Sequence, residues 1–250
     1  HRTLDLSGCP ALLLVPPAPT RTLLVWFHGG GWVIGAPDLS LGETDALAHL
    51  ANTKVLSVDY RMAPEHPFPA AYDDAIAAVQ WAIDAAAELD IDPTTISVGG
   101  DSAGGNLAAA VAQHFGSQIR GQLLVYPAVD LTRESQSALD YAEGFLLNGP
   151  TMQWFANQYL GDSDRRDPRV SPLLAADDVI AAVAPAHIVV AECDPLRDDG
   201  LAYAARLRDA GVAVSVDHHD DQMHGFFSLP SVLPGAQRAI ERAAEFLRGL

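Results

Sequence analysis

The sequence has a single lysine, Lys54, two cysteines and no long apolar run in its 250 residues. A single lysine excludes any mechanism that needs a catalytic lysine elsewhere in the chain. The two cysteines, Cys9 and Cys193, are too few for the disulfide framework of a small secreted domain. No apolar run approaches the roughly 18 residues of a membrane span, and no signal peptide is visible. We therefore expect no membrane span and a cytoplasmic location.

The chain is also short of positive charge, since its formal net charge is −17. Such a surface repels the phosphate backbone, which disfavours nucleic acid as a partner. The nucleotide-binding patterns G-x-x-x-x-G-K-[ST] and G-x-G-x-x-G are missing as well. With 49% apolar and 19% charged residues, the composition indicates a globular protein, and the length favours one domain over residues 1–250.

Short apolar runs alternate with helical patterns along the chain. Most runs are apolar at every position, which is typical of strands buried on both faces. This alternation predicts an α/β fold with a mostly parallel central sheet and helices on both of its faces. Residues 131–184 lack a strand pattern but contain several aromatics, so we predict that this insertion contributes to a cap. The predicted strands are Leu12–Val15, Leu23–Phe27, Val55–Asp59, Ile96–Gly99, Leu123–Tyr126, Ile188–Ala191 and Val212–Val216.

The strongest local pattern is G-x-S-x-G at Gly100–Gly104. The predicted strand Ile96–Gly99 runs straight into it, and a helix of small residues follows. This context is typical of a nucleophile elbow, in which a sharp turn exposes the serine hydroxyl above the strand end. It makes Ser102 the candidate nucleophile. The alternative, a chance glycine-rich turn, is disfavoured by the strand and helix on either side.

Three glycines follow the predicted strand Leu23–Phe27, within His28–Trp32. Such a loop can point successive backbone N–H groups at one spot, where they stabilise the oxyanion of a tetrahedral intermediate. A loop of this type works together with the N–H of the residue after the nucleophile, here Ala103. The two glycine motifs are much more specific together than either is alone.

A serine hydrolase of this type carries its carboxylate and then its histidine after the serine. His224 is the favoured base, because it follows the last predicted strand and precedes Gly225. His218 and His219 are rivals that come just after that strand. The histidines match no zinc pattern, so we expect no metal and no cofactor.

The favoured carboxylate is Asp194, which lies at the carboxyl end of the predicted strand Ile188–Ala191. Catalytic groups gather at such strand ends in parallel sheets. Asp198 and Asp199 are alternatives, although both positions suit the start of a helix, where carboxylates cap N–H groups. Asp101 is expected to support the elbow without acting directly.

The chain resembles the hormone-sensitive lipase family of bacterial carboxylesterases. The resemblance implies the α/β-hydrolase fold with a small helical cap, and oxyanion N–H groups from Gly29, Gly30 and Ala103. It also strengthens the assignment of His224. Family members carry cap helices before the first strand, whereas here Leu4 enters the sheet, so an N-terminal cap segment is expected to be absent. The residues that carry the resemblance are His28–Trp32, Asp59–Pro69, Gly100–Gly105, Asp194–Asp198 and His224–Phe226.

These patterns predict a serine carboxylesterase that cleaves small-molecule esters through an acyl-enzyme, with short or medium acyl chains implied by the resemblance. An amide deacetylase that uses the same triad is an alternative. A non-catalytic receptor is disfavoured because His224 is present. The sequence leaves a homodimer open. The predicted apolar walls of the substrate site are Trp32, Met152, Trp154, Phe155 and Phe226.

Overall fold

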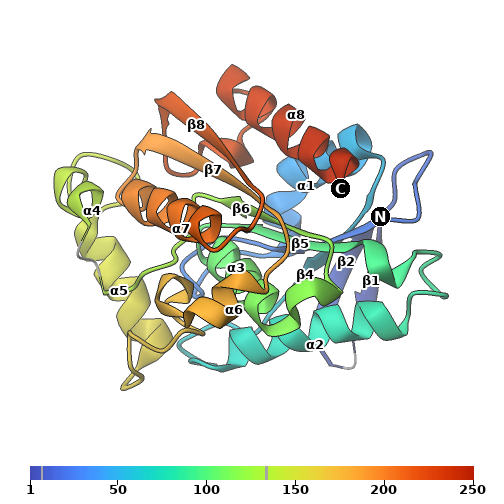
Figure 1. Cartoon of the computed structure of the whole chain (residues 1–250), viewed down its shortest axis with the longest axis horizontal. Coiled ribbons are helices and arrows are strands. Elements are labelled where there is room, and N and C mark those ends of the chain that lie inside the picture. The colour runs from blue at the N-terminus through green and yellow to red at the C-terminus, as the bar shows by residue number, and fades with distance from the viewer. Residues whose placement is uncertain (7, 133–134) are drawn as a thin grey trace.

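An eight-stranded sheet runs through the centre of the molecule in this computed structural model, which describes residues 1–6, 8–132 and 135–250 (Figure 1). The strand order is β1-β2-β4-β3-β5-β6-β7-β8. β2 pairs antiparallel with β1 and β4, and all the other pairs are parallel. The predicted mostly parallel sheet is therefore confirmed. The strands are β1 (Arg2–Asp5), β2 (Pro10–Leu14), β3 (Leu23–Phe27), β4 (Lys54–Val58), β5 (Ile96–Asp101), β6 (Gly121–Val125), β7 (Ala186–Cys193) and β8 (Val214–Met223).

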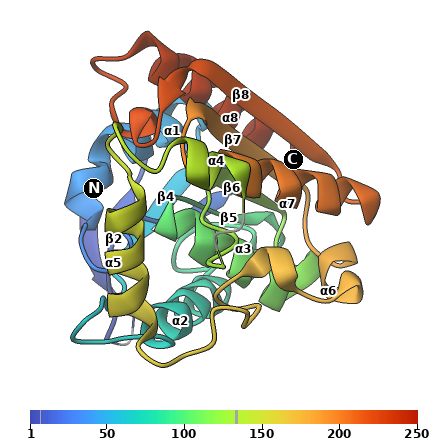
Figure 2. The same ribbon diagram turned by 90° about the vertical axis from the view of Figure 1, so that its left-hand side faces the viewer.

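Helices cover both faces of the sheet, as the apolar runs predict. α1 and α8 pack together on one face, and α2, α3 and α7 cover the other (Figures 1 and 2). Every residue of β3, β4, β5 and β6 is buried, because these central strands have a covered face on each side. The helices are α1 (Leu41–Ala51), α2 (Ala70–Asp84), α3 (Ala103–Phe115), α4 (Gln136–Asp140), α5 (Gly149–Leu160), α6 (Asp177–Ala181), α7 (Arg197–Asp209) and α8 (Pro234–Gly249).

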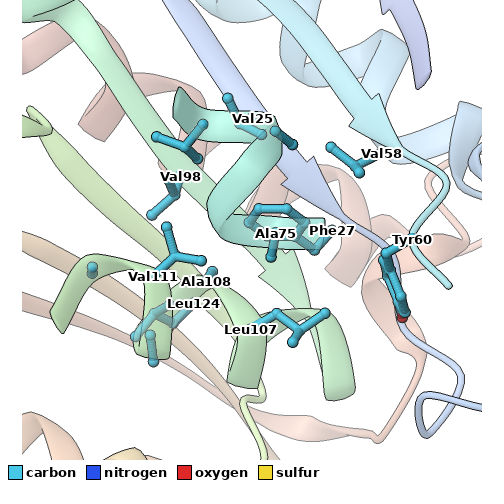
Figure 3. Close-up of a cluster of buried hydrophobic side chains, with 14 of the residues drawn as sticks. Val25, Phe27, Val58, Tyr60, Ala75, Val98, Leu107, Ala108, Val111 and Leu124 are labelled. Atoms are coloured by element: carbon cyan, nitrogen blue, oxygen red, sulfur yellow. The ribbon is translucent and has the colours of Figure 1, made fainter. Parts of the chain in front are cut away.

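The larger of two apolar cores lies between the sheet and the layer of α2 and α3. Figure 3 shows Val25 and Phe27 of β3 facing Ala75 of α2 and Leu107 of α3. α3 is buried along most of its length, because small side chains let it approach the sheet closely. This packing fixes the start of α3, where Ser102 lies, against the end of β5.

The last strand differs from the prediction. β8 runs from Val214 to Met223, so His218 and His219 lie inside it and not just after it. β8 lies at the edge of the sheet beside β7, and its side chains alternate between buried and exposed positions from Asp217 to Asp220. His218 and Asp220 take exposed positions, whereas Asp217 and His219 are buried and bonded to each other. In the sequence, the polar run after Val216 has the composition of a loop, so the predicted strand ended too early.

The segment at residues 131–184 forms α4, α5 and α6 and contains no strand among its described residues. Residues 133 and 134 of this segment lie outside the described part of the chain. α4 and α5 lie at one end of the molecule, at the left in Figure 1 and in front in Figure 2. The described part of the chain has no helix that is both long enough and apolar enough to cross a membrane.

Candidate active site

Ser102 occupies the sharp turn between β5 and α3. Its φ of +56° and ψ of −115° lie in a strained region for a residue with a side chain. The turn needs glycine nearby, because a Cβ on Gly104 would lie 1.9 Å from the carbonyl oxygen of Phe27. The Ser102 N–H donates to the carbonyl of Val125 at 2.9 Å. The backbone thus holds the nucleophile elbow in the geometry that the motif predicts.

His224 lies between Ser102 and Asp194 and is hydrogen-bonded to both. Its Nε2 is 3.0 Å from Ser102 Oγ, and its Nδ1 is 2.7 Å from Asp194 Oδ2. Asp194 is fully buried, and its Oδ1 accepts the N–H of Leu196 at 2.8 Å. With the carboxylate beside Nδ1, that nitrogen carries the proton, and Nε2 is left to accept the serine proton.

The rival histidines are engaged elsewhere. His218 Nε2 lies 2.8 Å from a carboxylate oxygen of Glu192. His219 is buried in β8, and its Nε2 lies 2.8 Å from Asp217. In the part of the chain that the structure describes, neither histidine bonds to Ser102. The structure thus brings His224, and neither of these rivals, to Ser102.

The rival carboxylates are also held away from the histidine. Asp198 pairs with Arg197 at 2.9 Å and accepts the N–H of Ser137 at 2.8 Å. Asp199 is buried in α7, and burial raises the pKa of its carboxyl to about 7. Through its bond with Ser137, Asp198 joins α7 to α4 and does not cap its own helix. Asp194 is the carboxylate that the structure brings to His224.

The structure of the glycine loop contradicts the prediction for one of the three oxyanion residues. The N–H of Gly29 donates to Asp101 Oδ1 at 2.8 Å, so this donor is already used inside the protein. Gly29 does not line the cavity at Ser102, whereas Gly30, Gly31 and Ala103 do. The assignment of Gly29 to the oxyanion hole is wrong, because its peptide faces Asp101 and not the cavity.

A cavity of about 400 Å³ opens beside Ser102 and His224. Its wall is mostly apolar. Three of the predicted wall residues line it: Trp32, Met152 and Phe155. Trp32 also stacks on the buried ring of Tyr159, at 4.4 Å between centroids. Such a wall suits the hydrocarbon part of a small ester.

Two predicted wall residues do not line this cavity. Trp154 is 51% exposed and lies outside the cavity wall. Phe226 is only 1% exposed and packs against the rings of Tyr126 and His219, so it belongs to the core. The spacing along α5 explains the first error, because Met152 and Phe155 are three residues apart on one helix face. Trp154 lies on a different face.

Several residues of the wall were not predicted from the sequence. Isolated leucines in loops have no local pattern that distinguishes a cavity wall from a core, so no signal in the sequence identified them. Asp130 is a charged residue among them, and Asp101, which was expected only to support the elbow, lines the cavity as well. The missed wall residues include Ile34, Asp130, Leu131, Leu146, Leu147, Thr151 and Leu196.

Asp101, the residue before the nucleophile, is a buried carboxyl that lines the cavity. Burial raises its pKa to about 6, while its hydrogen bond from Gly29 and the charge of His224 act in the opposite direction. Among the described residues, no three His, Cys, Asp or Glu side chains are grouped so as to hold a metal ion. The chemistry available here is that of a nucleophile, a base and backbone amides.

Comparison with known proteins places this geometry in a family. The family described as alpha/beta hydrolase fold matches residues 24–228. The chain belongs to this family. The carboxylic ester hydrolase LipN of Mycobacterium tuberculosis is 46% identical over 222 residues, which cover 83% of this chain and 57% of LipN. The ethyl acetate hydrolase of Pseudomonas putida is 39% identical over 256 residues, which cover 98% of this chain and 80% of that enzyme.

Solved structures of esterases also resemble this chain in fold and sequence. The structure of a hyperthermophilic esterase from the archaeon Pyrobaculum calidifontis superposes with a TM-score of 0.94 at 36% identity. The match covers 99% of this chain and 82% of that one. The predicted α/β-hydrolase fold and the resemblance to hormone-sensitive-lipase-type carboxylesterases are both confirmed.

Proposed function

We propose that this chain hydrolyses carboxylic esters with Ser102 as nucleophile, His224 as general base and acid, and Asp194 as the orienting carboxylate. The single observation that carries the proposal is the unbroken pair of hydrogen bonds from Asp194 through His224 to Ser102. The relatives named as carboxylic ester hydrolase and ethyl acetate hydrolase support ester hydrolysis as the reaction class.

The reaction has two halves. Ser102 Oγ attacks the ester carbonyl carbon while its proton passes to Nε2 of His224, and the carbonyl oxygen becomes an oxyanion. Collapse of this intermediate breaks the bond to the alkoxy group, which leaves as the alcohol with the proton from His224. Water then gives a proton to His224 and attacks the acyl-enzyme. Release of the carboxylic acid returns the proton to Ser102.

The oxyanion is stabilised by the backbone N–H groups of Gly30, Gly31 and Ala103. All three residues line the cavity beside Ser102. Ala103 is the first residue of α3, so its N–H has no partner within the helix and lies at the positive end of the helix dipole. Preorganised donors of this kind act only where negative charge develops, so they accelerate the chemical step.

Cavity size favours short and medium acyl chains. About 400 Å³ holds a small ester, and the apolar wall offers little to a charged acyl group. Asp194 and Asp101 supply the buried negative charge at the reacting end. We therefore expect activity on neutral esters with acetyl to hexanoyl groups.

Hydrolysis of p-nitrophenyl acetate and butyrate tests the proposal, with Ser102→Ala as the control. We expect turnover by the parent protein and a loss of at least about 10³-fold in the variant. Activity that survives Ser102→Ala would overturn the nucleophile assignment. A parent protein that binds these esters without cleaving them would overturn the enzymatic function itself.

A further inference from the structure

The residue before the nucleophile joins the two halves of the oxyanion hole. Asp101 ends β5, and its Oδ1 accepts the N–H of Gly29, which lies in the loop after β3. A Cβ on Gly29 would lie 2.2 Å from Asp101 Oδ2, so the carboxylate lies directly against the glycine backbone. β3 and β5 are adjacent parallel strands, with Phe27 paired to Gly100. The glycine loop and the elbow follow the carboxyl ends of these two strands and therefore lie side by side.

The glycine loop needs such a restraint because its backbone is intrinsically free. Gly30 and Gly31 have φ values of +116° and +60°, which only glycine adopts readily. Within the loop, the imidazole Nδ1 of His28 lies 2.7 Å from the Gly29 carbonyl oxygen, and the Gly30 carbonyl accepts the N–H of Ile34 at 3.0 Å. In a planar trans peptide the N–H points opposite to the C=O, so these two bonds orient the N–H groups of Gly30 and Gly31.

Those bonds set the internal shape of the loop but not its distance from the nucleophile. His28 and Ile34 belong to the loop itself or follow it directly. The hydrogen bond from Gly29 to Asp101 is different, because it runs to the residue next to Ser102. The loop donors must lie within hydrogen-bonding distance of the same oxygen as the Ala103 N–H, and small displacements of such donors slow catalysis strongly.

We propose that Asp101 is a positioning residue that fixes the glycine donors of the oxyanion hole relative to Ser102, through its hydrogen bond from Gly29. The proposal rests on the proposed ester hydrolysis. In this proposal Asp101 acts through Gly29 and makes no contact of its own with the substrate carbonyl or the transferred proton. Its effect appears only when the oxyanion forms, so it raises kcat and leaves ground-state binding unchanged.

Two substitutions distinguish the positioning effect of Asp101 from the effect of its negative charge. Asp101→Ala removes the acceptor, whereas Asp101→Asn keeps an acceptor oxygen for Gly29 and removes the negative charge near His224. We expect Asp101→Ala to lower kcat for p-nitrophenyl butyrate by about 10- to 100-fold with KM changed less than about threefold. Asp101→Asn should stay within about fivefold of the parent protein.

A transition-state analogue gives a second readout that a general loss of stability does not move. An alkyl trifluoromethyl ketone forms a tetrahedral adduct with a serine nucleophile, and its oxyanion occupies the hole. Its affinity should fall in Asp101→Ala by the same factor as kcat/KM. Asp101→Ser, whose side chain is too short to reach Gly29, should behave like Asp101→Ala and serves if the alanine variant does not fold.

Asp74 offers a matched control. It is 7% exposed, compared with 8% for Asp101, and it likewise accepts one backbone N–H at 2.8 Å, from Arg61, in addition to its ion pair with the Arg61 guanidinium. It lies outside the cavity wall, so Asp74→Ala should lower the melting temperature without changing kcat.

Three results would overturn the positioning role. One is a kcat within about twofold of the parent in Asp101→Ala, and another is an equal loss in Asp101→Ala and Asp101→Asn. The third is a fall in kcat that leaves the affinity for the ketone unchanged. If Ser102→Ala retained activity, the proposed function would fail instead, so the two failures are distinguishable.

Discussion

The ring of Tyr126 lies 4.5 Å from the imidazole of His224, centroid to centroid, with the two planes tilted by 49°. Tyr126 is buried at the end of β6, and its N–H donates to the Val189 carbonyl at 2.7 Å. Its φ of +33° is unusual for a residue with a side chain. The catalytic imidazole is therefore backed by an aromatic face that the sheet holds in place.

We predict that Tyr126→Leu lowers kcat for p-nitrophenyl butyrate by about tenfold, because the imidazolium formed during the reaction loses a buried aromatic contact worth roughly 1.4 kcal/mol. Tyr126→Phe keeps the ring and should stay within about threefold of the parent protein. Steady-state kinetics, with thermal melting as a check on folding, measures both. Equal losses in the two variants would show that the hydroxyl, and not the ring, matters.

The carboxylate of the triad can be tested against a near neighbour. Asp194→Asn keeps the shape of a fully buried side chain but allows the wrong tautomer of His224, so we expect kcat to fall by about 10³- to 10⁴-fold. Asp198→Asn changes a carboxylate that bonds to Arg197 and Ser137 and should stay within about fivefold. A larger loss in Asp198→Asn than in Asp194→Asn would reassign the acid.

The parts of the site that sequence predicted are those with a local pattern. A strand, G-x-S-x-G and a helix of small residues specify the elbow within about ten residues, and order along the chain points to Asp194 and His224. The bond between Gly29 and Asp101 joins positions 72 residues apart and depends on which strands become neighbours. No local pattern reveals which strands are neighbours, and Gly29 was assigned to the oxyanion hole from the family resemblance instead.

The substrate wall was predicted less well, for a related reason. Aromatic residues were assigned to it by type, but helix phase decides which of them face inward. On α5 that phase selects Met152 and Phe155 and places Trp154 in solvent. The cap limits at residues 131–184 and a cytoplasmic location stay predictions from the sequence, and a homodimer stays open.

Adjacent residues on α5 provide a test of the cavity wall. Phe155 lies against Gly31, where an added Cβ would come within 2.3 Å of its ring, while Trp154 faces solvent. We expect Phe155→Ala to enlarge the cavity and to raise kcat/KM for p-nitrophenyl octanoate relative to the acetate by at least about fivefold. Trp154→Ala should leave that ratio unchanged. A shift in Trp154→Ala alone would place the acyl chain outside this cavity.

Glu43 is a buried carboxyl behind the elbow that the mechanism does not use. It lies on α1 and is 1% exposed. Burial, followed by the charge of Asp101, raises its pKa from 4.5 to about 8. The folded protein therefore holds a proton on Glu43 at neutral pH, whereas the unfolded chain has lost it.

This difference makes stability depend on pH. Between about pH 4.5 and 8 the folded state binds more protons than the unfolded state, so the free energy of unfolding falls as pH rises through this range. Glu43→Gln has a similar shape and does not titrate. It should match the parent protein near pH 5 and exceed it at pH 9 by an amount on the order of a few kcal/mol.

Urea unfolding of both proteins from pH 5 to 9 measures this difference. The buried carboxyls of Asp101 and Asp199, with pKa values raised to about 6 and 7, add falls of the same sign in both proteins. Subtracting one curve from the other removes their shared part and isolates Glu43. A difference that is constant across this pH range would mean that Glu43 is already ionised in the folded protein, in contact with water or with a cation.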